Sequence, residues 1–281
     1  MAAGFRIIRF TISIALTALL LGCASDTMDV EDIEKQSLSA AEIYKRGEIE
    51  LSKGRYEKSA VYFGEIERLF PYSEWAKRGL IMQAYALNKD ENYQGSRAAA
   101  SRFADFYPAE KDTAYAYYLI GLSYYDQINA IGRDQKVTRE ALQAFRIVFE
   151  QYPDSEYAEP SRRKFDLAYD HLASKEMEIG RYYLKGNYHS AAINRFRRVV
   201  EEFQSTNHTA EALHRLVESY LSIGLTEEAQ TAGAILGHNY NDSTWYKSSY
   251  ALLQEQGLSP RATGNGWLRR IHRQVIKGQW L

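Results

Sequence analysis

One short pattern recurs along the chain and restricts its fold more than any other feature. The stretches "RLFPYSEWAKR" (68–78) and "EQYPDSEYAEP" (150–160) both carry an aromatic residue, a proline, a serine and a glutamate in the same order. Proline cannot continue a helix and favours an extended residue before it, whereas serine followed by an acid is typical of a helix start. The chain is therefore expected to be an array of helices whose boundaries repeat.

The spacing of residues between these boundaries predicts helix pairs. Within residues 40–71, six positions follow the tetratricopeptide repeat (TPR), a helix-turn-helix unit of about 34 residues: Gly47, Gly54, Tyr56, Ser59, Phe63 and Pro71. We expect Gly47 to let the two helices approach closely, and Gly54 to end the first helix in a left-handed cap. Tyr56 and Phe63 would then share one face of the second helix.

The boundary recurs often enough to define the whole fold. Prolines mark it at positions 71, 108 and 153, and an aromatic residue alone marks two later junctions, at Phe203 and Tyr240. The predicted fold class is all-α: a TPR solenoid of about five helix-turn-helix units, preceded by a lipoprotein signal peptide. The solenoid is predicted over 39–256, with units near 40–73, 74–111, 112–156, 157–206 and 207–256.

Two of the predicted units are longer than the others. The stretch "INAIGRDQKVT" (128–138) is the expected insertion between the helices of the third unit. In the fourth unit, residues 159–185 are expected to form one continuous helix. Insertions in a solenoid often mark a binding face, but tolerated loop drift explains them equally well.

The N-terminus is not expected to belong to the solenoid. Arg6 and Arg9 precede the uncharged stretch "FTISIALTALLLG" (10–22), and "LLGC" ends at Cys23, the only cysteine. This stretch is shorter than the roughly 20 apolar residues that span a bilayer, and its layout predicts a secretory signal peptide. The alternative to a lipoprotein signal is an ordinary signal peptide with an incidental cysteine.

The end of this stretch resembles the lipobox of bacterial lipoproteins. The resemblance implies that residues 1–22 are removed and that Cys23 carries N-palmitoyl and S-diacylglycerol groups. Residues 23–38 would then form a lipid-anchored flexible linker. Ala24 follows the cysteine, which by analogy with enteric lipoproteins points to the outer membrane.

The C-terminal tail (257–281) is predicted to be basic and amphipathic. Its apolar stripe comprises Trp267, Leu268, Ile271, Val275 and Ile276, and its basic side comprises Arg269, Arg270, Arg273 and Lys277, with no acid. Such a helix caps the solenoid, docks on a partner, or lies on anionic lipid. The sequence leaves all three interpretations open.

Nothing in the sequence predicts catalysis or cofactor binding. The six histidines are never spaced by three or four residues, the spacing that places two metal ligands on one helix face. A glycine-rich phosphate loop and a GxSxG element are also absent. The formal net charge of -1 gives no electrostatic support for nucleic acid binding. We therefore predict no catalytic residue, no metal and no cofactor, and favour a binding protein.

Two groups of residues are candidates for partner binding. In "FPYSEW" (70–75), Tyr72 lies on the predicted turn, whereas core packing is an alternative explanation for Phe70 and Trp75. In "AAINRFRRVVEEF" (191–203), Arg195 is predicted at the edge of the core face, while Arg197 and Arg198 fan outward. An arginine that borders a core suits a bidentate contact with a carboxylate across an interface; the alternative is a solvated surface arginine.

Several longer stretches resemble one known family. They are "LFPYSEWAKRGLIMQAYA", "AYAYYLIGLSYYDQI", "QYPDSEYA", "KEMEIGRYYLKGNYHSAAINRFRRVVEEF" and "AEALHRLVESYL". Together with the lipobox they resemble the BamD family, the TPR lipoproteins of the outer-membrane β-barrel assembly (BAM) complex. The resemblance covers roughly residues 20–256, and the tail after residue 258 departs from the pattern of the family.

This resemblance implies a non-catalytic scaffold at the periplasmic face of the outer membrane. Its implied partners are BamA, other BAM lipoproteins and unfolded outer-membrane proteins. Arg195, with Arg197 and Arg198, would contact the POTRA domain of BamA nearest the membrane. Tyr72, Ser73 and Phe70 would receive the C-terminal β-signal of an unfolded barrel protein, although this loop looks shorter than in enteric relatives.

Two other functions remain open at this point. The first is another TPR lipoprotein of the envelope, such as a secretin pilotin or a cell-division cofactor. The second is an enzyme that acts on peptidoglycan, for which the sequence offers no catalytic group.

Overall fold

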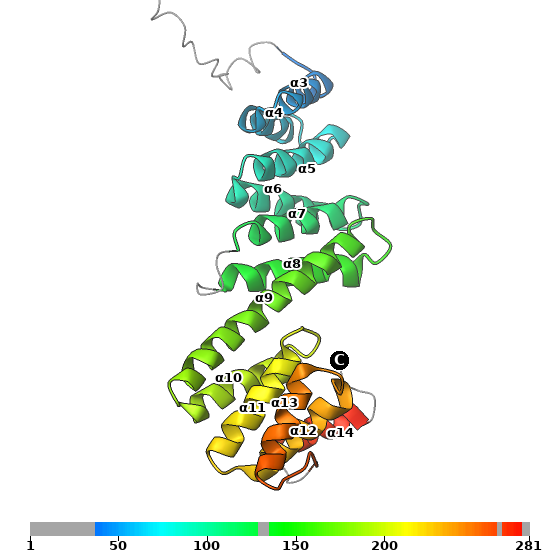
Figure 1. The fold of residues 1–281 in the computed structure, drawn as a ribbon. Coiled ribbons are helices and arrows are strands. Elements are labelled where there is room, and N and C mark those ends of the chain that lie inside the picture. The colour runs from blue at the N-terminus through cyan, green and yellow to red at the C-terminus, as the bar shows by residue number, and fades with distance from the viewer. Residues whose placement is uncertain (1–36, 129–134, 263–265, 277–281) are drawn as a thin grey trace, which may run out of the picture. The chain divides into compact units, whose positions relative to one another are not determined.

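The computed structural model describes residues 37–128, 135–262 and 266–276. The predicted signal peptide, Cys23 and most of the predicted linker lie outside these residues. The helices are α3 (Ala40–Ser52), α4 (Tyr56–Leu69), α5 (Glu74–Lys89), α6 (Tyr93–Phe106), α7 (Thr113–Tyr125), α8 (Lys136–Gln151), α9 (Ala158–Lys185), α10 (His189–Glu202), α11 (Thr209–Ser222), α12 (Thr226–Asn239), α13 (Thr244–Glu255) and α14 (Trp267–Ile276) (Figure 1). No strand occurs among the described residues, so the all-α prediction is confirmed.

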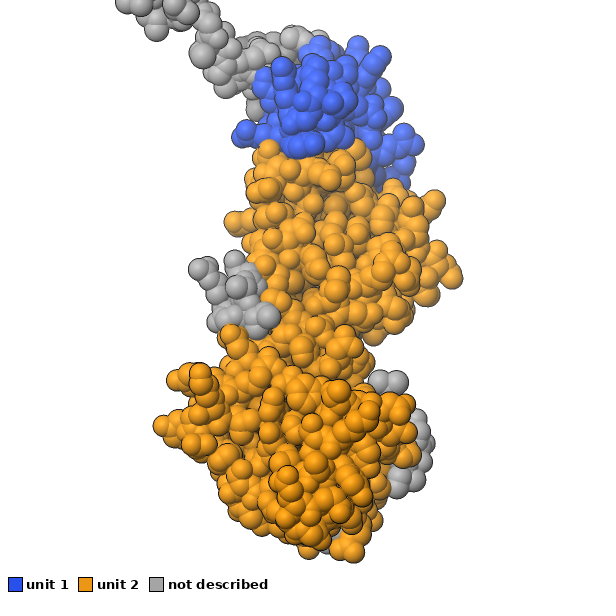
Figure 2. Space-filling model, viewed as in Figure 1, with its two compact units in different colours: residues 1–79 blue, residues 80–281 orange. Residues whose placement is uncertain are grey.

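The chain divides into two compact units, residues 1–79 and 80–281 (Figure 2). The described part of the first unit contains α3, α4 and the start of α5. The second unit contains the rest of α5 and all later helices. Within the second unit, each helix from α6 to α12 packs against the next one along the chain.

A glycine and a phenylalanine set the approach of α3 and α4 in the first unit. A Cβ atom at Gly47 would lie 2.8 Å from the ring of Phe63, closer than van der Waals contact allows. The Ser59 hydroxyl also donates a hydrogen bond of 2.9 Å to the Gly47 carbonyl oxygen. The predicted role of Gly47 is confirmed, and so is the left-handed cap at Gly54, whose φ is 73°.

The same contact recurs in the second unit. A Cβ atom at Gly121 of α7 would lie 2.5 Å from Phe145 of α8, and one at Gly180 of α9 would lie 2.4 Å from Phe196 of α10. Both phenylalanine side chains are completely buried. Because glycine lacks a side chain, each ring lies directly against the backbone of the neighbouring helix.

The long helix α9 connects two parts of the second unit. It is continuous from Ala158 to Lys185, which confirms the helix predicted over 159–185, and it packs against both α8 and α10 (Figure 1). Rings follow one another along this contact, with centroids 5.3 Å apart for Phe149 and Phe165, and 5.0 Å apart for Tyr169 and Phe203. Aromatic contacts of this kind add to the stabilisation from burial.

The insertion predicted over 128–138 is described only at its ends. Helix α7 ends at Tyr125 and α8 begins at Lys136, and residues 129–134 lie outside the described part of the chain.

The C-terminal tail closes the core of the second unit. The side chains of Leu268, Ile271 and Val275 are buried in a cluster with residues of α10, α11 and α12. The indole nitrogen of Trp267 donates a hydrogen bond of 3.1 Å to the hydroxyl of Tyr220 on α11. Among the described residues of α14, the apolar stripe therefore caps the core, and its buried side chains are not free to lie on lipid.

Helices long and apolar enough to cross a membrane were not found in the described parts of the chain. This search did not include the apolar stretch 10–22.

A buried histidine joins α11 to α13 within this core. His214 is 5% exposed, and its Nδ1 lies 2.8 Å from the hydroxyl oxygen of Ser249. Its Nε2 lies 3.6 Å from a carboxylate oxygen of Glu218. Burial lowers the pKa of His214 below its ordinary value of 6.5, with the positive charge of Arg215 acting in the same direction and Glu218 opposing it.

We predict that this histidine makes the fold sensitive to acid. Because its pKa is lowered in the folded state, the unfolded chain binds the proton more readily, and stability is lost as the pH falls from about 6.5 through the folded pKa. The substitution His214→Gln should remove this part of the loss, which is at most about 1.4 kcal/mol per pH unit. The measurement is the free energy of unfolding in urea at pH 7 and pH 5.5.

The exposed His238 provides the control, since His238→Gln should leave the loss seen in the parent unchanged. Equal losses in the parent and in His214→Gln would contradict the assignment.

Candidate functional site

The loop between α4 and α5 presents one aromatic side chain fully to solvent. Tyr72 is 97% exposed, and its φ of 65° lies in the left-handed region that residues other than glycine rarely adopt. The backbone therefore turns sharply at this residue, and the ring extends away from the two helices. An exposed aromatic residue on a constrained turn is suited to contact a partner.

The two neighbours of Tyr72 have structural roles in the same loop. The Ser73 hydroxyl accepts a hydrogen bond of 3.0 Å from the backbone N–H of Ala76 and donates one of 2.8 Å to the Phe70 carbonyl oxygen. Ser73 thus caps the start of α5, and Phe70 is partly buried at the end of α4. Of the three residues predicted to receive a β-signal, Tyr72 is the one whose side chain is fully exposed to solvent.

Other aromatic residues of the first unit pack together beside this loop. The ring centroids of Tyr44 and Trp75 lie 5.3 Å apart, and those of Tyr44 and Phe63 lie 5.1 Å apart. The guanidinium carbon of Arg78 lies 5.5 Å from the centroid of the Trp75 ring. Packing therefore accounts for Trp75, in agreement with one of the two interpretations of the sequence.

A buried carboxylate on α9 holds two of the three arginines of α10 that are predicted to bind BamA. Glu176 is 8% exposed. One of its oxygens lies 3.2 Å from Nη1 of Arg195, and the other lies 3.0 Å from Nη1 of Arg198. Nε of Arg198 also donates to a carboxylate oxygen of Glu202 at 3.0 Å. We call Glu176, Arg195 and Arg198 the α9–α10 clamp.

The clamp corrects part of the prediction made from the sequence. Arg195 does border the core and does face a carboxylate, but that carboxylate is Glu176 of the same chain. Arg197 and Arg198 do keep exposed side chains, as expected, but both also make contacts within the chain that the sequence did not indicate. Arg198 turns back to Glu176, and the guanidinium of Arg197 lies over the Trp267 ring, 4.9 Å from its centroid. Helical periodicity places a side chain on a face but does not show which distant residue it contacts.

The clamp retains a solvent-exposed side. The side chains of Arg195 and Arg198 are 37% and 46% exposed, so their remaining N–H groups are accessible to a partner. A cavity of about 240 Å³ lies beside the clamp, lined in part by Arg139, Lys175, Glu176 and Arg198.

The structure also shows a groove that the sequence had not indicated. A cavity of about 640 Å³ lies between the α6–α7 loop and the α8–α9 loop, lined by residues 108–112 and 151–157. Tyr157 forms part of its wall and packs on Tyr115, with ring centroids 4.7 Å apart. In the sequence, the only hint of this groove is the "YP" that recurs in both loops. Such a recurrence does not show that successive loops enclose a groove.

Two histidine clusters contain the residue types of a catalytic triad but lack its geometry or its access to solvent. Ser249, His214 and Glu218 are arranged as in a hydrolase triad, but Ser249 is completely buried and cannot reach a substrate. At His208, Ser174 and Asp170 both approach Nε2, whereas a triad requires partners on different nitrogens. Groups of three or more metal-ligating side chains were not found in the described residues.

Comparisons with known proteins place these features in a family. A family model described as YfiO, outer membrane lipoprotein, matches residues 36–235. The outer membrane protein assembly factor BamD of Caulobacter vibrioides is 45% identical over 218 residues, which cover 78% of this chain and 72% of that protein. The protein of the same name from Rickettsia prowazekii is 40% identical over 242 residues, covering 86% and 95% of the two chains. That from Neisseria meningitidis serogroup A is 28% identical over 246 residues.

We predict that Glu176→Gln loosens the contact between α9 and α10. The amide keeps the shape of the side chain but loses the charge that both arginines share, so the free energy of unfolding should fall by about 1–3 kcal/mol. Glu178→Gln is the control, because the Glu178 side chain is 58% exposed and its ion pair with Lys175 is 3.9 Å long. Its effect should stay below about 0.5 kcal/mol. Equal effects of the two substitutions in urea unfolding would contradict the role of the clamp.

Proposed function

Because the chain belongs to the YfiO family of outer membrane lipoproteins, we propose that it is an outer membrane protein assembly factor of the BAM complex. The observation that carries this proposal is the similarity to BamD proteins along most of the chain, at up to 45% identity. The protein would act as a non-catalytic scaffold that promotes the insertion of unfolded β-barrel proteins. It would be held at the periplasmic face of the outer membrane by the acyl groups on Cys23.

The lipid anchor is the part of the proposal that can be tested independently of any partner. Mass spectrometry of the mature N-terminus would identify the acyl groups at Cys23.

An affinity purification through a tag after Leu281 separates the proposal from its alternatives, since a secretin or a cell-division protein in place of BamA would support a different envelope lipoprotein.

The α9–α10 clamp supports a contact with BamA through Arg195. Its guanidinium is anchored by Glu176, which limits the rotamers that binding would have to fix, and it keeps N–H groups exposed for a carboxylate of the partner. Replacing it with glutamate would place two carboxylates side by side and disturb the fold, so a neutral substitution is the better test.

We predict that Arg195→Gln weakens binding to purified BamA at least tenfold, about 1.4 kcal/mol or more, because a charged contact is lost. Glu176→Gln is the matched control: it removes the anchor of the arginine but leaves the arginine in place, so binding should fall by a smaller factor, about two- to threefold. The measurement is a titration of detergent-solubilised BamA, with circular dichroism to check helix content. Equal losses in both variants would show that Arg195 acts only through the clamp.

The exposed Tyr72 supports the proposal that the first unit receives an extended segment of an unfolded barrel protein. A β-signal contains alternating apolar residues and a terminal aromatic residue, and such residues pack favourably on an exposed ring. Phe70 and Ser73 would contribute by holding the loop in shape, through the contacts described above.

We predict that Tyr72→Ala lowers photocrosslinking to a β-signal peptide at least threefold without a change in stability, since the side chain makes few contacts within the fold. Tyr182→Ala, which removes a ring that is 73% exposed on α9, should leave the yield unchanged. If the two variants and the parent give the same yield, Tyr72 does not belong to the peptide site.

A further inference from the structure

The basic side of α14 lies outside the part of the chain that the family model matches, which ends at residue 235. After Glu255 the sequence contains no aspartate or glutamate, but it contains Arg261, Arg269, Arg270, Arg273 and Lys277. The last part of the chain is therefore strongly basic, although the whole chain has a formal net charge of -1.

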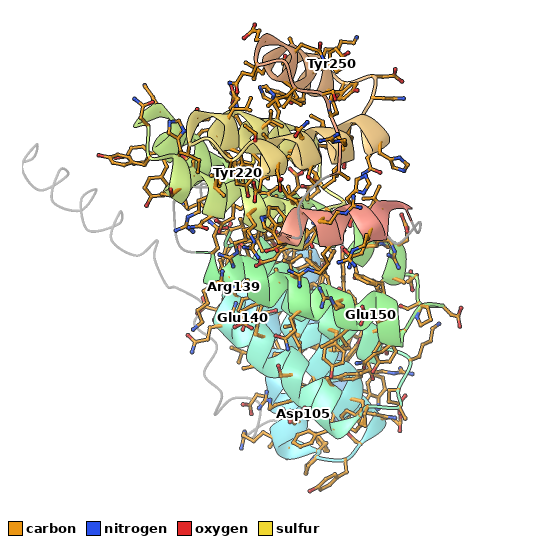
Figure 3. All side chains as sticks on the ribbon, turned by 90° about the horizontal axis from the view of Figure 1, so that it is seen from below. Asp105, Arg139, Glu140, Glu150, Tyr220 and Tyr250 are labelled. Atoms are coloured by element: carbon orange, nitrogen blue, oxygen red, sulfur yellow. The ribbon has the colours of Figure 1, made fainter. Side chains whose placement is uncertain are left out.

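Contacts with the core hold α14 in a defined orientation. Leu268, Ile271 and Val275 are at most 7% exposed, and Trp267 is hydrogen-bonded to Tyr220, the α11 residue labelled in Figure 3. Arg269 donates a hydrogen bond of 2.8 Å to the carbonyl oxygen of Ala262. The opposite face of the helix thus points to solvent in a fixed position, which lowers the entropic cost of binding a partner.

Two arginines on this exposed face form no ion pair with the described residues. Arg270 and Arg273 are both exposed and three positions apart, so their side chains lie on the same side of the helix. Neither forms a hydrogen bond or an ion pair within the described residues, whereas exposed arginines on other helices pair with carboxylates, such as Arg163 with Glu159 and Arg181 with Glu211.

A further positive charge lies close by on the same helix. Burial lowers the pKa of His272, and the charges of Arg269 and His238 act in the same direction, so Arg269 adds to the positive charge of α14. Like charges that are not compensated within the chain attract anions from outside it.

The geometry points to a docking surface for an acidic segment of a partner protein on the face of α14 that carries Arg270 and Arg273. A bilayer surface is a poorer fit, because a helix that lies on a membrane needs a free apolar face, and the described apolar side chains of α14 are buried in the core. Arginine is also the residue best suited to hold a carboxylate through two parallel hydrogen bonds.

The test is fluorescence anisotropy with the full-length protein in detergent and a labelled peptide of six Glu-Asp repeats. The double substitution R270E/R273E should weaken peptide binding at least tenfold. The control R146E/R163E changes the net charge by the same amount, at exposed arginines of α8 and α9, and should stay within about twofold.

A Gln-Asn peptide of equal length should not bind, and binding of the acidic peptide should weaken as salt is added. Equal binding by the parent and R270E/R273E, or equal losses in both double variants, would overturn the proposal. A competition experiment provides one more outcome that would overturn the proposal. If short-chain phosphatidylglycerol displaces the labelled peptide at a lower concentration than unlabelled peptide does, and phosphatidylcholine does not displace it, the surface binds a lipid headgroup instead. Because BamA takes no part in this assay, its outcome is separate from that of the proposed function.

Discussion

The contact between a glycine on one helix and a phenylalanine ring on the next is the constraint on which three helix pairs depend, α3–α4, α7–α8 and α9–α10. At Gly47, Gly121 and Gly180, a Cβ atom would lie only 2.4–2.8 Å from the facing ring. The ring fills the space that a side chain would take, so it sets both the distance between the helices and their register. Between α12 and α13 other pairs serve this purpose, since Gly233 faces Leu253 and Gly237 faces Tyr246.

This way of packing decides which side chains remain for binding. Most large aromatic residues near the helix pairs are used internally, as in the ring contacts that run from Phe149 to Phe203 along α9. Polar side chains of the loops also make contacts within the fold, because the Ser73 and Ser243 hydroxyls accept hydrogen bonds from backbone N–H groups at the starts of α5 and α13. The exposed ring of Tyr72 is an exception, and it is therefore a reasonable point of contact for a partner.

The α9–α10 clamp shows how one residue type serves two purposes. A carboxylate as buried as Glu176 requires compensation, and two arginines supply it from both sides. The same arginines keep part of their guanidinium groups in solvent, so that a role in the fold and a role at an interface do not exclude each other. Besides stabilising the contact between α9 and α10, these salt bridges hold the arginines in place.

Local signals in the sequence determined the helical array, the left-handed cap at Gly54, the close approach at Gly47 and the length of α9. Each of these depends on residues within one helix pair, where proline, glycine and periodic apolar residues act over short distances. Only the tertiary structure decided that Arg198 turns back to Glu176, that α14 covers the core instead of lipid, and that two loops enclose a groove. These features join residues that are far apart in the sequence, and helical periodicity assigns a side chain to a face without identifying what will pack against it.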